Sequence, residues 1–123
     1  MSHALIIEQN MIIGSELSRR LSNFGFDSFD HVWTEEDAVA VADMRPPDLI
    51  LVGDNLETGD AVEAARRICE KRDVPVLMVT SDSFRVKQRL SNGAVLDGPF
   101  AFSKIPLAIK AAYNRPSQRT SIH

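Results

Sequence analysis

The sequence has little of the chemistry that catalytic and metal-binding proteins usually carry. Its 123 residues include one cysteine, Cys69, which excludes an internal disulfide and a cysteine-rich metal site. With 14 basic and 17 acidic residues the net charge is −3, so the chain as a whole lacks the positive charge that binds nucleic acid or an anionic membrane. No apolar run approaches the roughly 20 residues of a membrane-spanning helix, and the amino end has no signal-peptide pattern, which favours a cytoplasmic protein.

The residue types that usually hold ligands are scattered along the chain. His3, His31 and His123 show no metal-ligand spacing to one another or to Cys69, so we expect them at the surface. Cys69 falls in the helical pattern AVEAARRICEKR, where a small hydrophobic core residue is expected. No nucleophile and base, metal set or glycine-rich loop stands out, and we therefore do not expect an enzyme.

What the sequence does have is an alternation of strand-like and helical segments. Apolar residues make up 44% of the chain, enough for one core. Five runs predict strands: ALII (4–7), FDHVW (29–33), LILV (49–52), VPVLMVT (74–80) and AVL (94–96). Five segments of helical period predict helices over 10–26, 34–44, 60–72, 83–93 and 103–114.

The helical segments carry recognisable faces and caps. In the first, one face is formed by Ile13, Leu17, Leu21 and Phe24. Gly25 is its expected stop, and Thr34 and Ser103 are the expected N-caps of two later helices. Five strands alternating with five helices predict an α/β fold with a doubly wound parallel sheet. We expect one domain over residues 1–114, followed by a disordered polar tail over 115–123 with no output domain.

Four motifs stand at matching places along such a fold. They are ALIIEQN in the first strand, RPPDLILVGDNL around the third, VPVLMVTS in the fourth and VLDGPFAFSKIPLAI at the last strand and helix. Together, over residues 4 to 114, they resemble the receiver domain of bacterial two-component response regulators. The resemblance implies a single-domain, flavodoxin-like (CheY-like) fold of five parallel strands and five helices.

The resemblance also implies a phosphorylation pocket at the carboxyl ends of the strands. In the family an acidic pair and a phospho-accepting aspartate hold a magnesium ion, a lysine neutralises the phosphoryl group, and a Ser or Thr hydroxyl hydrogen-bonds to it. The matching positions here are Glu8 and Gln9 for the acidic pair, Gly53 for the acceptor, Thr80 and Ser81 for the hydroxyl and the small residue after it, and Gly98 for the lysine.

Three of the pocket's charged groups are therefore absent. Gln9 has lost a charge, Gly53 has no side chain to phosphorylate, and Gly98 supplies no cation. We interpret the chain as a pseudo-receiver, a stand-alone signalling module that lacks aspartyl phosphorylation and acts by protein–protein interaction. The implied partner is a histidine kinase, a phosphotransferase or an output protein, with no membrane, no direct nucleic acid and no cofactor.

Two residues support an alternative in which phosphorylation persists. A bulge at the strand end would swing the Asp54 carboxylate into the pocket, where with Glu8 it would form a weak magnesium site. Lys104 would reach a strand end if FAFS were the last strand. Against Asp54, a shift of one residue along a strand normally turns the side chain to the other face. A loop carboxylate and a solvated lysine are the simpler interpretations.

The surface offers one further candidate. Arg85, Lys87 and Arg89 make the predicted fourth helix locally basic. The resemblance implies a partner or homodimer interface formed by the fourth helix, the last strand and the last helix, but the same charges also suit a solvated helix face. A flavin-binding flavodoxin-like protein is a less favoured alternative, because the loop EQNMIIGS is not the phosphate cradle that flavin needs.

Overall fold

The computed structural model describes residues 2–53, 59–79, 86–89, 95–100 and 104–114. Within these ranges the strands are β1 (His3–Ile7), β2 (Ser28–Val32), β3 (Leu49–Val52), β4 (Val76–Val79), β5 (Val86–Arg89) and β6 (Val95–Phe100). The helices are α1 (Met11–Ser22), α2 (Glu35–Met44), α3 (Ala61–Cys69) and α4 (Ile105–Asn114). In this part of the chain no helix is long and apolar enough to cross a bilayer.

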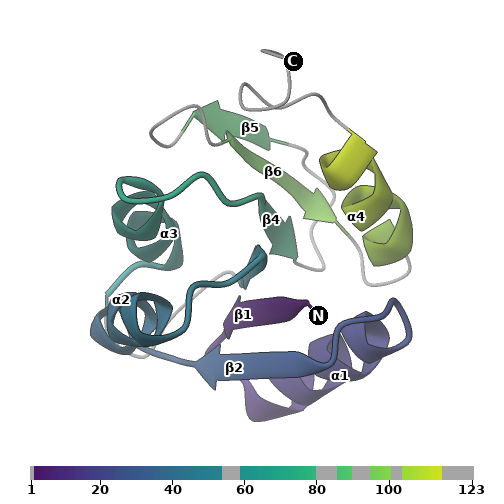
Figure 1. Ribbon diagram of the computed structural model, residues 1–123, viewed down its shortest axis with the longest axis horizontal. Helices are drawn as coiled ribbons and strands as arrows, with labels where there is room; N and C mark the ends of the chain where they lie inside the picture. Colours follow the sequence, from purple (N-terminus) through teal and green to yellow (C-terminus); the bar gives the residue numbers. More distant parts are fainter. Residues whose placement is uncertain (1, 54–58, 80–85, 90–94, 101–103, 115–123) are drawn as a thin grey trace.

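One sheet of order β2-β1-β3-β4-β6-β5 forms the middle layer. All its neighbours pair in parallel except β5, which runs antiparallel to β6. Helices α2 and α3 cover one face, while α1 and α4 cover the other (Figure 1). The α/β, flavodoxin-like fold of receiver domains that the sequence predicts is therefore confirmed.

The alternation of side chains along β1 and β3 explains the two layers of core. Leu5 and Ile7 pack with α2 and α3, whereas Ala4 and Ile6 pack with α1 and α4. Because successive side chains of a strand point to opposite faces, a run buried on both faces must be apolar throughout. The run LILV meets this requirement, and all four of its residues are buried.

The ends of α1 and α2 follow from local hydrogen bonding. Thr34 caps α2 as predicted, since its Oγ1 accepts from the Asp37 backbone N–H at 3.1 Å. The α1 helix ends at Ser22, and Gly25 then adopts a left-handed φ of 99°. The prediction that Phe24 faces the core was wrong: Phe24 is 41% exposed, and Phe26 is buried in its place after the chain turns.

The predicted fourth helix was wrong over its central residues. Val86–Arg89 form β5, which pairs with β6 from Val86↔Gly98 to Arg89↔Val95. The segment is too short for its period to separate a helix from a strand, and pairing with a distant strand decides between them. The described residues therefore contain four helices and six strands, in place of the five of each that were expected.

A bulge in β6 accommodates its proline. Between the pairs Leu77↔Asp97 and Val79↔Phe100, the single residue Met78 on β4 stands opposite Gly98 and Pro99 on β6. Proline has no backbone N–H to donate, so it fits an interior strand only where the regular pairing is interrupted. The strand expected at 94–96 consequently extends to Phe100.

Cys69 is confirmed as a core residue. Its side chain is buried beside α2 and β4, and its Sγ lies 3.8 Å from the Val74 carbonyl oxygen. Burial raises the pKa of the Cys69 thiol to about 11, because the charged thiolate would lose its hydration. A neutral thiol is therefore part of the folded state.

The raised pKa of Cys69 predicts a loss of stability at alkaline pH. The folded thiol keeps its proton between an ordinary pKa of 9.0 and about 11, while the unfolded thiol loses it. Linkage then lowers the free energy of unfolding by up to about 3 kcal/mol as pH rises through that window. Urea unfolding of wild type and Cys69→Ala at several pH values measures the difference; parallel profiles would contradict the assignment.

Candidate functional site

The site lies where β1 and β3 end side by side at the carboxyl edge of the sheet. The two strands pair in parallel up to Ile7↔Val52. Beyond that pair, the Gly53 N–H donates to the Ile7 carbonyl at 2.8 Å, and on the other side of β1 the Glu8 N–H donates to the Val32 carbonyl at 3.0 Å. These bonds continue the strand pairing by one step and fix Glu8 and Gly53 as neighbours.

The Glu8 side chain occupies the space beside Gly53. A Cβ atom placed on Gly53 would overlap Glu8 Oε1 and lie 2.7 Å from its Cδ. Glu8 is only 7% exposed, and its Oε2 accepts a hydrogen bond of 2.8 Å from the Asn10 backbone N–H. Any side chain at position 53 must therefore compete with a buried, hydrogen-bonded carboxylate.

Among the residues that the structure describes, the donor set does not fit the magnesium ion of a phosphorylation pocket. Magnesium demands an octahedral arrangement of oxygen ligands, usually with more than one carboxylate or phosphate. Here Glu8 is committed to Asn10, Gln9 is exposed, and Gly53 offers no side chain. Among the residues described, no three His, Cys, Asp or Glu side chains lie close enough together to hold a metal ion.

The remaining predicted site residues are placed only in part. Gly98 lies in β6 at the bulge, and Lys87 and Arg89 lie in β5 rather than on a helix. Lys104 is exposed immediately before α4. The other predicted positions lie outside the described residues: Asp54, Thr80, Ser81 and Arg85.

Asn10 is a member of the site that the sequence analysis missed. Its Oδ1 accepts from the backbone N–H groups of Ile12 at 2.9 Å and Ile13 at 3.1 Å, so it caps α1. Its own N–H holds Glu8, which joins the pocket to the start of the helix. An asparagine directly before a helical pattern is an N-cap signal, and this signal was available in the sequence.

His31 was expected at the surface, but it is half-buried and belongs to the site. Its Nε2 donates to the Glu8 carbonyl oxygen at 2.8 Å, and its ring meets Trp33 edge-on with centroids 5.7 Å apart. The ring also fills the space beside Gly14 of α1, where an added Cβ would lie 2.5 Å from Nε2. A glycine inside a helix often marks such a close approach, but the sequence does not show which residue approaches.

His3 was expected at the surface, and that prediction was wrong. It is buried at the amino edge of the sheet, opposite the pocket, with Nδ1 2.8 Å from Ser28 Oγ and Nε2 2.9 Å from Asp30 Oδ2. Its backbone N–H donates to Asp48 Oδ2 at 2.8 Å. These partners satisfy a buried polar ring and tie β1 to β2 and to the start of β3.

The fold is the one that response-regulator receiver domains have. The chain is 29% identical over 122 residues to the transcriptional regulatory protein PdtaR of Mycobacterium tuberculosis, an alignment that covers 96% of this chain and 60% of PdtaR. The chain thus spans about three fifths of the length of this relative. No protein-family model matches it.

Solved structures agree on the fold. The N-terminal domain of a response regulator/sensory box/GGDEF protein from Carboxydothermus hydrogenoformans matches with a TM-score of 0.73 and 22% identity, over 98% of this chain and 99% of that one. The PhyR receiver domain of Erythrobacter litoralis matches with a TM-score of 0.72 and 23% identity, over 94% and 95%. The homologues of this chain are receiver domains of response regulators, and the resemblance found in the motifs is confirmed.

The contact between Glu8 and position 53 predicts a specific double-variant effect. Gly53→Ala should lower the free energy of unfolding by about 1–3 kcal/mol, because the methyl group overlaps the Glu8 carboxylate. Adding Glu8→Ala should recover most of this loss, whereas adding the equally long Glu8→Gln should not. Chemical denaturation of the variants measures the coupling, and additive effects would contradict the geometry.

Proposed function

We propose that this chain is a receiver-type signalling module that works without aspartyl phosphorylation and acts by binding a protein partner. A receiver needs a carboxylate at the acceptor position as nucleophile and a nearby cation for the transferred phosphoryl group. Neither Gly53 nor Gly98 supplies these groups. The proposal also implies that magnesium is not required.

The observation that carries the proposal is the Glu8 carboxylate at Gly53. The loss of an aspartate alone would leave room in the pocket, but here the adjacent side chain fills that room and is held by Asn10. The packed core and the receiver topology are retained around it. The retained fold and the filled pocket together support a protein that acts through its surface and not through phosphorylation.

Partner binding then replaces covalent modification as the input. A ligand shifts a conformational equilibrium only by the difference between its affinities for the two states, and a protein partner can supply that difference as well as a phosphoryl group can. The similarity to response regulators supports two-component signalling as the setting of this exchange.

Incubation with a phospho-donor tests the proposal directly. The intact mass of the protein should remain unchanged after treatment with acetyl phosphate and magnesium, because the described pocket has neither acceptor nor cation. A response regulator with a complete pocket serves as the positive control. A gain of one phosphoryl group, mapped by peptide sequencing to Asp54, would instead make the chain a working receiver.

A second prediction concerns repair of the pocket. Gly53→Asp alone should accept phosphoryl groups poorly, since Glu8 crowds the new side chain and Gly98 supplies no cation. Gly53→Asp combined with Glu8→Asp, which shortens the crowding side chain, and Gly98→Lys should be labelled much faster by radioactive acetyl phosphate. Rapid labelling of the single variant would show that the lysine position is not Gly98.

A further inference from the structure

A second polar cluster lies at the amino edge of the sheet, opposite the pocket. His3 of β1 is the partner of Ser28 in the parallel pairing with β2, and Asp30 stands two residues further along β2. Because side chains two apart on a strand share a face, these three side chains project from the same face of the sheet. The His3 ring lies between the other two, with Nδ1 2.8 Å from Ser28 Oγ and Nε2 2.9 Å from Asp30 Oδ2.

The hydrogen bonds of this cluster have one consistent direction when the ring is neutral. The Asp30 carboxylate only accepts, so Nε2 of His3 carries the ring proton and Nδ1 is left as an acceptor. Arg45, which follows α2, only donates, and its Nη1 lies 3.0 Å from Ser28 Oγ. The Ser28 hydroxyl therefore accepts from Arg45 and donates its own proton to Nδ1 of His3.

We infer that this cluster is an acyl-transfer site in which Ser28 is the nucleophile, His3 is the general base and Asp30 positions the imidazole. The three groups have the order of the serine hydrolase triad, which is recognised by its geometry and roles and not by sequence position. The inference goes beyond the proposed function and does not rest on it, because the cluster and the closed pocket lie at opposite edges of the sheet.

The base is held in place, and the nucleophile lies closer to solvent. His3 is only 8% exposed, and its backbone N–H donates to Asp48 Oδ2 at 2.8 Å. Ser28 is half-buried at the start of β2, which is an edge strand of the sheet. General-base catalysis requires an imidazole within hydrogen-bond reach of the proton that it removes, and the Ser28 hydroxyl meets this condition.

Two donors are placed to stabilise the negative charge that develops on an attacked carbonyl oxygen. The Arg45 guanidinium contacts Ser28 Oγ and supplies a positive charge there. Val32 directs its carbonyl to β1, where it accepts from the Glu8 N–H. Since backbone groups alternate in direction along a strand, Ser28 also faces β1, and the Phe29 N–H faces the free edge of the sheet. In α/β-hydrolases the N–H of the residue after the nucleophile is an oxyanion donor.

The charges of the cluster favour a small uncharged acyl ester as substrate. Asp30 and Asp48 both bind His3, so two carboxylates face the one guanidinium and disfavour an anionic acyl donor. Ser28 Oγ attacks the carbonyl carbon as its proton passes to His3 Nδ1. The bond to the leaving oxygen then breaks, and Nδ1 returns the proton to that oxygen, which leaves as an alcohol. Water attacks the Ser28 ester by the same route, releases the acid and restores the serine.

Incubation of the full chain with p-nitrophenyl acetate tests the inference. The intact protein should gain one acetyl group, and peptide sequencing by mass spectrometry should place that group on Ser28. The variant Ser28→Ala should lose this adduct. The ester carries no phosphoryl group, so the result is separate from the treatment with acetyl phosphate, and either proposal can fail while the other stands.

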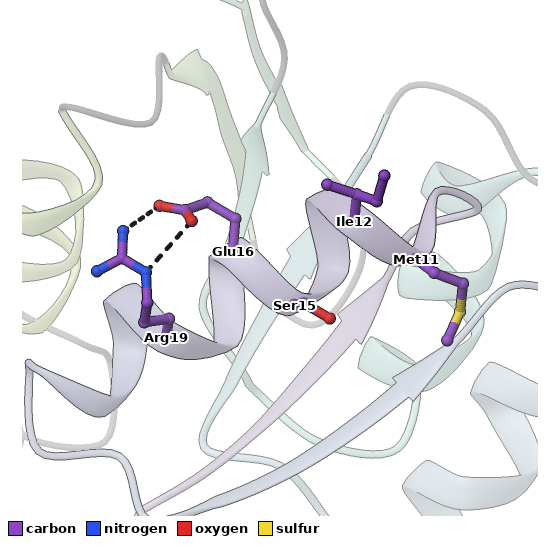
Figure 2. A pocket seen from close by; sticks show the side chains of 5 residues that line it. All are labelled: Met11, Ile12, Ser15, Glu16 and Arg19. Carbon is purple, nitrogen blue, oxygen red and sulfur yellow. Dashed lines mark hydrogen bonds and ion pairs between the residues drawn. The ribbon is translucent and has the colours of Figure 1, made fainter.

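Ser15 is the matched control serine. It is exposed on α1 in a shallow groove, shown in Figure 2, whose lining contains no histidine: Met11, Ile12, Ser15, Glu16 and Arg19. A serine hydroxyl is a weak nucleophile unless an adjacent base removes its proton, so Ser15 should not be acetylated. The variant Ser15→Ala should be acetylated on Ser28 at the rate of the wild type.

The variant Asp30→Asn separates positioning from a structural role. An asparagine amide donates to Nε2, which moves the ring proton of His3 to Nδ1 and removes the acceptor for the Ser28 hydroxyl proton. Acetylation of Ser28 should fall at least about a hundredfold, and the nitrogen NMR shifts of His3 should change to those of the Nδ1–H tautomer. No adduct on the wild type, equal acetylation of Ser15, or acetylation of Asp30→Asn at the wild-type rate would overturn the inference.

Discussion

In this structure the carboxyl ends of β1 and β3 leave room for one side chain beside Gly53, and the chemistry of the site depends on which strand supplies it. In this chain β1 supplies Glu8, and β3 supplies only the backbone of Gly53. The exclusion is mutual, because a Cβ on Gly53 would overlap the carboxylate. A buried carboxylate must also be hydrogen-bonded, and the backbone N–H of Asn10 donates to it. Asn10 is also the residue that caps α1. The pocket, the helix start and the glycine are therefore one interdependent unit.

Much of the fold could be predicted from the sequence, where burial on both faces dictates the residue type. LILV was placed to the residue, and Thr34 was correctly identified as a cap, because both signals are local. Segment 86–89 could not be placed, since its strand conformation depends on pairing with β6 and not on its own period. His3 was misplaced for the same reason: its partners on β2 are more than twenty residues away.

In the candidate site, too, local features could be read from the sequence, whereas features that depend on strand pairing could not. The sequence shows glycine at positions 53 and 98, where the resemblance implies the acceptor aspartate and the lysine. The sequence did not show that Glu8 fills the space beside Gly53. This contact follows from the register of β1 on β3 and from the direction of the Glu8 side chain. The carbonyl bond from His31 likewise joins residues that only the pairing of β1 with β2 brings together.

A receiver without a covalent input must draw its switching free energy from binding. Reversing a two-state equilibrium from one extreme to the other takes about 5.5 kcal/mol of differential affinity. A few buried apolar contacts and desolvated ion pairs can supply that amount, provided that they form in one state and not in the other. In the described structure His31 links the surface to the site, because its ring contacts Trp33 and its Nε2 donates to the Glu8 carbonyl oxygen. The His31 ring thus joins the Trp33 ring to the backbone of the residue whose side chain fills the space beside Gly53.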